Sequence, residues 1–170
     1  MLILLYDASI LHLSAGLHKL WDSLSATVNG TSSVGGVVGQ TNSGAILTAC
    51  YSTGDVTLES NNPNSTYAGG VVGSNGASST LTACYATGRV TGSGSGSGTI
   101  YVGGVTGSNN LGTLTACYWS GLPDNDNGGA TKVDGTTVTW QTAVAAMNAA
   151  LSGKGWQYEL TGELPTLKKQ

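Results

Sequence analysis

A 34-residue repeat constrains the fold of this chain more than any other feature. The pentapeptide LTACY occurs three times, at residues 47–51, 81–85 and 114–118. A glycine doublet precedes each copy, at residues 35–36, 69–70 and 103–104. Each unit reads GGVVG (GGVTG in the third), a polar turn, LTACY, a small-residue step and a variable polar loop. A unit of this size cannot bury its apolar face alone, so neighbouring units must stack on one another.

The repeat is typical of strands and turns. Glycine makes up 27 of the 170 residues, and each glycine in a helix costs about 1 kcal/mol relative to alanine. Equivalent strands of stacked units pair in parallel about 4.8 Å apart, which places Leu47, Leu81 and Leu114 in one ladder, a column of equivalent side chains on successive coils. We therefore predict an all-β fold, a short parallel β-solenoid of about three 34-residue coils with a C-terminal capping helix.

Three regions follow from the extent of the repeat. Residues 1–30 form an N-terminal segment with a degenerate repeat remnant, SATVNG, and residues 31–122 hold the three repeats. Residues 123–170 form a C-terminal cap. The GSGSGSG segment at residues 92–98 resembles a flexible linker, but the repeat period runs through it, which predicts a loop on one edge of the stack.

The cap contains one amphipathic segment. Apolar residues recur at helical spacing, which predicts a helix at about residues 139–151, with Thr139 as its N-cap and Gly153 as its C′ residue. A closing strand follows the helix. We expect the cap to cover an exposed end of the stack, because the strand edges there lack partners.

Charge and hydropathy limit the partners. Only 9% of the residues are charged and the net charge is −3. There is no basic patch, which argues against nucleic-acid binding, and no apolar run of the length that a transmembrane segment needs. The apolar opening of the chain is interrupted by Asp7 and lacks preceding basic residues, so it is a poor signal peptide. A truncated start or a helical end-piece fits it better.

Cys50, Cys84 and Cys117 occupy the fourth place of each LTACY. Three is an odd number, and the coil spacing exceeds the Cβ separation that a disulfide prefers. No histidine or second cysteine lies nearby in the repeat, so a metal site is not favoured. We predict a ladder of free thiols packed in a narrow core, and no cofactor.

The aspartates offer one weak metal candidate. Asp124, Asp126 and Asp134 lie in and after DNDNGG, which resembles the start of a calcium loop. The twelfth position, where an EF-hand needs glutamate, is Gly135. The alternative is a polar turn between the last coil and the cap.

Asp55 and Arg89 are 34 residues apart. They therefore occupy equivalent places on adjacent coils, where we expect them to pair across the ladder. An exposed pair of this kind contributes about 0–1 kcal/mol.

Aromatic residues follow each cysteine. Tyr51, Tyr85 and Tyr118 form a ladder with Trp119 beside the last. Facing outward, they would make a strip that stacks on sugar rings; facing inward, they would be core or half-buried. Alternation along LTACY puts Leu, Ala and Tyr on one side and Thr and Cys on the other, so burial of both rows requires the strand to bend.

The threonines of LTACY form a second possible surface. Thr48, Thr82 and Thr115 align in one row of hydroxyl groups. Flat threonine arrays on solenoids can bind ice, and a single row is weak evidence for that function.

The GGVVG and GGVTG segments, each followed by ACY and a small-residue step, resemble the GLUG-motif repeats of bacterial secreted and surface proteins. The resemblance covers residues 34–121, with valine where that motif has leucine, as at Val37 and Val71. The run from YWSG to the C-terminus is also similar to the end-piece that follows such repeats. The resemblance implies an exported protein with a binding or structural role, and it supplies no catalytic residue.

The expected function is therefore a non-catalytic, adhesin-like module, secreted or on the bacterial cell surface. A place within a longer chain is part of this expectation. The module would make multivalent contacts with host or matrix glycans or proteins. A structural spacer is the main alternative. A polysaccharide-active enzyme is less favoured, because the repeat has one stacked charged pair and no second carboxylate in reach. An ice-binding solenoid is the remaining alternative.

Overall fold

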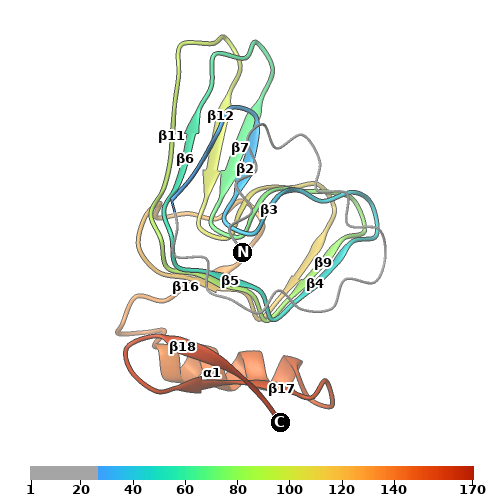
Figure 1. Ribbon diagram of the computed structural model, residues 1–170, viewed down its shortest axis with the longest axis vertical. Coiled ribbons are helices and arrows are strands. Elements are labelled where there is room, and N and C mark those ends of the chain that lie inside the picture. The colour runs from blue at the N-terminus through green and yellow to red at the C-terminus, as the bar shows by residue number, and fades with distance from the viewer. Residues whose placement is uncertain (1–26) are drawn as a thin grey trace.

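The computed structural model describes residues 27–170 and shows a short parallel β-solenoid (Figure 1). The first coil contains β1 (Val28–Gly30), β2 (Ser33–Gly35), β3 (Val38–Gln40), β4 (Ile46–Thr48) and β5 (Tyr51–Ser52). The second contains β6 (Val56–Glu59), β7 (Thr66–Gly69), β8 (Val72–Asn75), β9 (Thr80–Thr82) and β10 (Tyr85–Ala86). The third contains β11 (Val90–Ser93), β12 (Ile100–Gly103), β13 (Thr106–Asn109), β14 (Thr113–Thr115) and β15 (Tyr118–Trp119). The predicted fold class is confirmed.

Equivalent residues pair in register from coil to coil. Leu47 pairs with Leu81, and Leu81 pairs with Leu114. Val28 of β1 pairs with Val56 of β6, so the repeat remnant near the N-terminus is a strand of the first coil. The expectations for the opening of the chain concern residues 1–26, which lie outside the described residues.

The coil encloses two cores. Figure 1 looks along the stack, where β6 and β11 lie beside β2, β7 and β12 in a narrow arm. The buried residues of the arm are Val34, Val56, Leu58, Ala68 and Val90. The wider body, formed by β3, β4 and β5 and their equivalents in the next coils, is filled by a second cluster that includes Leu47, Leu81, Val72, Val105, Cys50, Cys84, Cys117 and Trp119. All three cysteines are free and buried, as predicted.

The glycine-rich segment of the third coil stacks on the loop of the second. A Cβ atom placed on Gly94, Gly96 or Gly98 would lie 1.7–2.3 Å from a backbone carbonyl oxygen of Ser60, Asn62 or Asn64. Real Cβ atoms do not approach an oxygen so closely, so glycine is needed at these three contacts between the two loops. The segment is therefore a loop of the stack, as expected, and its composition follows from close packing.

The GGVVG segment forms a sharp corner between β7 and β8. A Cβ on Gly69 would lie 2.0 Å from the carbonyl oxygen of Val72, and one on Gly73 would lie 2.6 Å from the amide nitrogen of Val34 in the preceding coil. Backbone touches backbone at both places, with no room for a side chain. The repeated glycines thus set the corner between the arm and the body.

The LTACY segment bends at its alanine. Ala49, Ala83 and Ala116 have φ angles of 55°, 54° and 50°, in the left-handed region that residues other than glycine rarely adopt. This turn breaks the alternation of the strand. The leucine and the cysteine both face the body core, whereas the alanine and the tyrosine face outward against the cap.

The C-terminal region forms a helix and a hairpin. The helix α1 (Trp140–Ala150) begins at Thr139, whose hydroxyl accepts from the Thr142 amide, as predicted. Its C-cap is Leu151, so the C′ residue is Ser152. Gly153, predicted as C′, lies one residue further on and has a φ of 73°. The expected closing strand is an antiparallel pair, β17 (Trp156–Leu160) with β18 (Pro165–Lys169).

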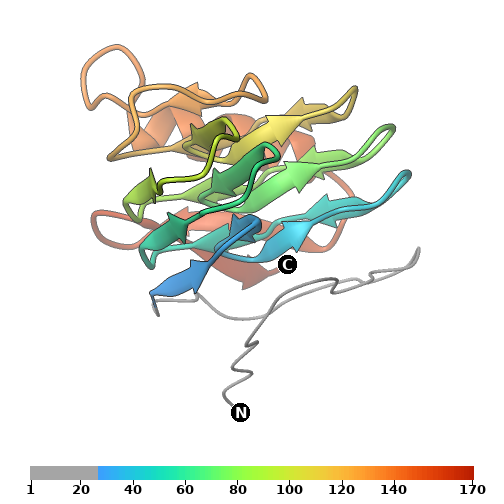
Figure 2. The same cartoon turned by 90° about the horizontal axis from the view of Figure 1, so that it is seen from above.

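The cap covers the side of the stack instead of its end. Figures 1 and 2 both place α1, β17 and β18 beside the coils. Met147, Leu151 and Tyr158 of the cap pack on the alanine and tyrosine ladders. The expected position was wrong because the bend at each LTACY alanine turns an apolar row outward, and that row requires a cover.

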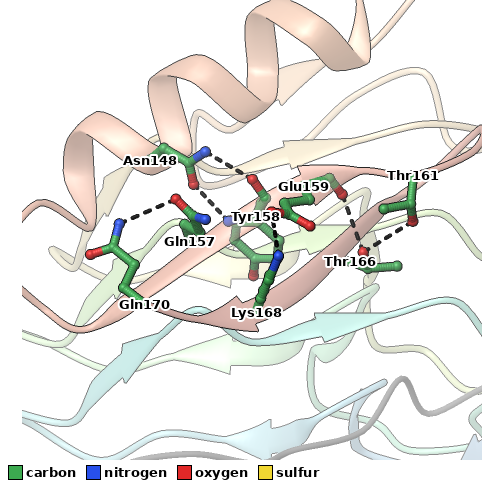
Figure 3. Close-up of polar contacts among 8 residues, drawn as sticks. All are labelled: Asn148, Gln157, Tyr158, Glu159, Thr161, Thr166, Lys168 and Gln170. Carbon is green, nitrogen blue, oxygen red and sulfur yellow. Dashed lines mark hydrogen bonds and ion pairs between the residues drawn. The ribbon is translucent and has the colours of Figure 1, made fainter.

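Polar contacts hold the cap together as one unit. The Asn148 side chain of α1 donates to the carbonyl oxygen of Tyr158 at 2.9 Å and accepts from its amide at 2.7 Å (Figure 3). On the hairpin, Lys168 pairs with Glu159 at 2.9 Å. The helix and the hairpin therefore keep a fixed relation while their apolar faces pack on the coils.

Alkaline pH is expected to destabilise the fold. Hydrogen bonding to Cys117 and Cys50, together with burial, raises the pKa of the Cys84 thiol well above its ordinary value. In an unfolded chain the pKa of a cysteine thiol is about 8.5. The stability that the neutral Cys84 contributes is therefore complete below that pH and decreases above it. Cys50 offsets part of this loss, because hydrogen bonding to Cys84 lowers the pKa of the Cys50 thiol.

Urea unfolding at pH 7.0, 8.5 and 9.5 measures this loss. Cys84→Ala is the matched control, and its free energy of unfolding should vary less across the same range. A wild-type free energy of unfolding that stays constant to pH 9.5 would contradict the burial of a neutral thiol. Burial also raises the pKa of Tyr158, which adds a further loss above about pH 10.

Candidate functional site

The tyrosine ladder faces the cap and offers little free surface. Tyr51 stacks on Tyr85 with ring centroids 4.8 Å apart, and Tyr85 meets Trp140 and Tyr158 edge-on at 5.3 and 5.6 Å. Tyr85 is fully buried, and its hydroxyl donates to the carbonyl oxygen of Pro165. Tyr51 and Tyr118 are half-buried, so the ladder is a packing surface for the cap.

Trp119 lies on the opposite side of its strand from the tyrosines. It is buried in the body core, and its Nε1 donates to the carbonyl oxygen of Pro123 at 2.9 Å. A Cβ on Gly104 would lie 2.2 Å from the Cγ of Trp119, so the indole fills the space that this glycine leaves. Of the four residues predicted as a binding strip, Trp119 packs in the body core and Tyr85 is buried under the cap.

Asp126 closes the end of the stack. In the second coil, the amides of Val71 and Val72 both donate to the carbonyl oxygen of Val105 at 3.0 Å. The corresponding amides of the third coil, Val105 and Thr106, donate instead to Oδ1 of Asp126 at 2.6 and 2.7 Å. The carboxylate thus takes the place of a carbonyl oxygen of a fourth coil.

The other oxygen of Asp126 is also engaged. Oδ2 accepts from the amides of Gly128 and Ala130 at 2.8 and 3.1 Å. The strand β16 (Thr131–Lys132) then pairs with β15. Residues 123–132 therefore continue the stack as a partial coil, in place of the cap expected to begin at residue 123.

The three candidate calcium ligands do not converge. Asp124 pairs with Lys132, and Asp134 accepts from the amides of residues 136–138 at 2.8–3.0 Å. The hydrogen bonds from Val138, Thr136 and Thr137 lower the pKa of Asp134 to about 2. Within residues 27–170 no group of three or more His, Cys, Asp or Glu could hold a metal ion. These carboxylates stabilise turns.

The expected pairing of Asp55 with Arg89 takes another form. Oδ1 of Asp55 accepts from the backbone amide of Arg89 at 2.8 Å, and no side-chain ion pair joins the two among the described residues. The carboxylate supports the turn before β11.

Two columns of threonine share the outer face of β4, β9 and β14. Thr48, Thr82 and Thr115 align as predicted. Two residues earlier in each strand, a second column reads Ile46, Thr80 and Thr113. The sequence reasoning considered only the first column. The isoleucine, which is well exposed, interrupts the hydroxyl groups of the second.

A shallow hollow of about 320 Å³ lies where the arm meets the body. Its lining residues are Tyr67, Tyr101, Gly107, Ser108, Asn109 and Asn127. Tyr67 and Tyr101 pair in register on β7 and β12, and their rings stack with centroids 5.5 Å apart and an angle of 18°. Tyr101 is 41% exposed, which leaves an aromatic surface open to a ligand.

The polar groups of the hollow are held in place by the coils. In the side chain of Asn109, Oδ1 accepts from Nδ2 of Asn75 at 2.8 Å and Nδ2 donates to the carbonyl oxygen of Gly112. Asn127 reaches the hollow from the partial fourth coil, and its Nδ2 donates to the carbonyl oxygen of Gly107 at 2.7 Å. Its Oδ1 therefore has a fixed position.

Several polar atoms of the hollow are free. Within the described part of the chain, the hydroxyl groups of Tyr67, Tyr101 and Ser108 have no hydrogen-bond partner, and neither has Oδ1 of Asn127. No acidic or basic side chain lines the hollow. An uncharged site with an aromatic surface and free hydroxyl groups suits a neutral ligand that carries both C–H and O–H groups.

The sequence reasoning missed this pair of tyrosines. Tyr67 and Tyr101 each stand two residues before a glycine doublet, 34 residues apart. The first coil has Ser33 at this position, so the column lacks the threefold identity of LTACY. The spacing alone could have found the pair.

Comparison with known families identifies one coil directly. The GLUG motif matches residues 64–91, from just before β7 to the start of β11. The matched segment includes Tyr67 and the glycines of the second GGVVG. Searches among curated proteins and among solved structures found no match. Within residues 27–170, no helix is long and apolar enough to cross a bilayer.

Proposed function

We propose that this chain, a GLUG-repeat protein, is a non-catalytic, adhesin-like module that binds carbohydrate on a glycan or glycoprotein. The observation that carries the proposal is the hollow at Tyr67 and Tyr101. Protein sites for small ligands combine apolar or aromatic surface with a few fixed polar groups. Export to the cell surface or the medium is part of the proposal and rests on the resemblance to bacterial surface proteins.

A single site of this size binds weakly. At about −0.3 kcal/mol per non-hydrogen atom, the ~12 such atoms of a hexose give a dissociation constant in the millimolar range. Useful attachment would therefore come from many copies acting together on a surface. Weak single sites are what a multivalent adhesin requires.

A catalytic role is less supported by this site. Glycoside hydrolysis needs two carboxyl groups that flank the bond, and the hollow is lined by none. Asp124, Asp126 and Asp134 hold turns and backbone amides elsewhere. The spacer alternative predicts no ligand at all, so a binding measurement separates it from the proposal.

The first test is a screen of the folded protein against an array of glycans and matrix proteins, displayed as multivalent complexes on beads. We expect saturable binding to glycans that free sugar inhibits at millimolar concentration. Tyr101→Ala should reduce binding at least tenfold. Absence of any saturable ligand would favour the spacer.

A further inference from the structure

We infer that the hollow takes one neutral pyranose ring, stacked on the face of Tyr101 that points away from Tyr67, with sugar hydroxyl groups bonded to Ser108 and Asn127. This inference rests on the proposed function and specifies the ligand of the same site. Its basis is the direction of the rings, the position of the free polar atoms and the absence of charge.

The ring direction selects one face. Tyr67 covers one face of Tyr101, because the two rings lie nearly parallel. The strand β12 is the last in its sheet, whose order is β12-β7-β2, so within residues 27–170 no further strand brings a ring onto the other face. A sugar ring presents C–H groups on one side, and these pack on the negative face of an aromatic ring.

Two polar residues that line the hollow lie level with Tyr101 or beyond it in the stack. Ser108 belongs to β13, the neighbouring strand of the same coil, and its hydroxyl can both donate and accept. Asn127 comes from the partial fourth coil, beyond β12 in the stack. Its Oδ1 is an acceptor, and its Nδ2 already donates to the carbonyl oxygens of Val102 and Gly107. A sugar hydroxyl that donates to Asn127 and another that bonds to Ser108 would fix the orientation of the ring.

The lining also excludes charged sugars as preferred ligands. No lysine, arginine, aspartate or glutamate reaches the hollow, so a carboxylate or an ammonium group would lose water without gaining a partner. A volume of about 320 Å³ is at the small end of ligand pockets, which suits one ring better than a long chain segment.

The test is an NMR titration of the ¹⁵N-labelled protein with glucose, galactose, mannose and N-acetylglucosamine, and with glucuronic acid and glucosamine as charged counterparts. We expect at least one neutral sugar to shift the amides of residues 101, 107–109 and 127, with a dissociation constant at least threefold lower than that of either charged sugar. Shifts confined to other coils would overturn the inference.

Matched variants assign the contacts. Tyr101→Phe keeps the aromatic face and should retain binding within about threefold, whereas Tyr101→Ala should weaken it at least tenfold. Ser108→Ala should weaken it several-fold, and Ser74→Ala, at the equivalent place one coil earlier, should not. Equal effects of the two serine changes would contradict the assigned orientation even if Tyr101→Ala failed to fold.

The two proposals can fail separately. If the array yields a glycan whose binding survives Tyr101→Ala and Ser108→Ala, the carbohydrate-binding function stands and this site assignment is wrong. If neither the array nor the titration yields a ligand, both proposals fail.

Discussion

Gly69→Ala is expected to lower the free energy of unfolding by about 3 kcal/mol or more. The new methyl group would lie 2.0 Å from the carbonyl oxygen of Val72 and 2.7 Å from both the amide nitrogen of Gly107 and the carbonyl oxygen of Val105. All three atoms belong to the backbone, so no side chain can rotate away. The corner between the arm and the body must open, or a coil must shift.

The loss would spread beyond the corner. The amides of Val71 and Val72 both donate to the next coil at this place, and a shifted corner would lengthen those bonds. Typical domains have a free energy of unfolding of about 5–15 kcal/mol, so this one methyl group removes a large fraction. The same argument explains why Gly35 and Gly103 stand at equivalent places, with Cβ positions 2.2 and 1.9 Å from a carbonyl oxygen.

Urea unfolding followed by circular dichroism measures the change. Gly162→Ala is the matched control, because a Cβ at that glycine would meet no atom within 4 Å; its free energy of unfolding should stay within about 0.5 kcal/mol of the wild type. A Gly69→Ala protein as stable as the Gly162→Ala protein would show that the corner is looser than the structure has it.

Sequence reasoning predicted what the repeat determines. Equivalent positions must pair in register when units stack in parallel, so the leucine ladder and the buried free cysteines followed from spacing alone. The helix followed from apolar spacing, and Thr139 marked its start. These features depend on local residue chemistry and on the period of the repeat, and both can be read from the amino-acid sequence.

The direction of side chains around the coil could not be predicted in the same way. Alternation along a strand holds only while the backbone stays extended, and the left-handed conformation of Ala83 reverses it within LTACY. Alanine is not a residue that signals this conformation. The tyrosine ladder therefore faces outward because of a backbone turn that the sequence does not predict. The lateral position of the cap depends on the same turn.

The candidate site needed contacts between distant segments. Tyr101 and Asn127 lie 26 residues apart and meet only because residues 123–132 form a partial coil above β12. The role of Asp126 was hidden for the same reason. Its partners are the backbone amides of another coil, and backbone amides have no sequence signature.

Asp126→Ala is expected to destabilise the protein by about 2–4 kcal/mol. The substitution leaves four backbone N–H groups without their acceptor, those of Val105, Thr106, Gly128 and Ala130. An unsatisfied buried donor costs about 1–3 kcal/mol, and the site is only partly buried, so water can replace some of the lost bonds. The partial fourth coil should detach from the third.

Asp126→Asn is the matched control for charge and shape. Its single carbonyl oxygen can accept from only one of the two amide pairs, and its NH₂ group would face the donors of the other. We expect a loss about half that of Asp126→Ala. Urea unfolding measures the total loss in the free energy of unfolding. Amide hydrogen exchange at Val105 and Thr106 measures the local loss: it should be faster in both variants, whereas exchange in β7 and β8 should change less.

Addition of calcium tests whether Asp126 binds a metal ion instead of backbone amides. Because both oxygens of Asp126 already accept from backbone amides, millimolar Ca²⁺ should leave the unfolding temperature of the wild type unchanged. A calcium-dependent rise that disappears in Asp126→Ala would mean that the loop rearranges to bind the ion. In that case the carboxylate would bind the ion when calcium is present, and it would accept from the amides of the third coil only in the calcium-free protein.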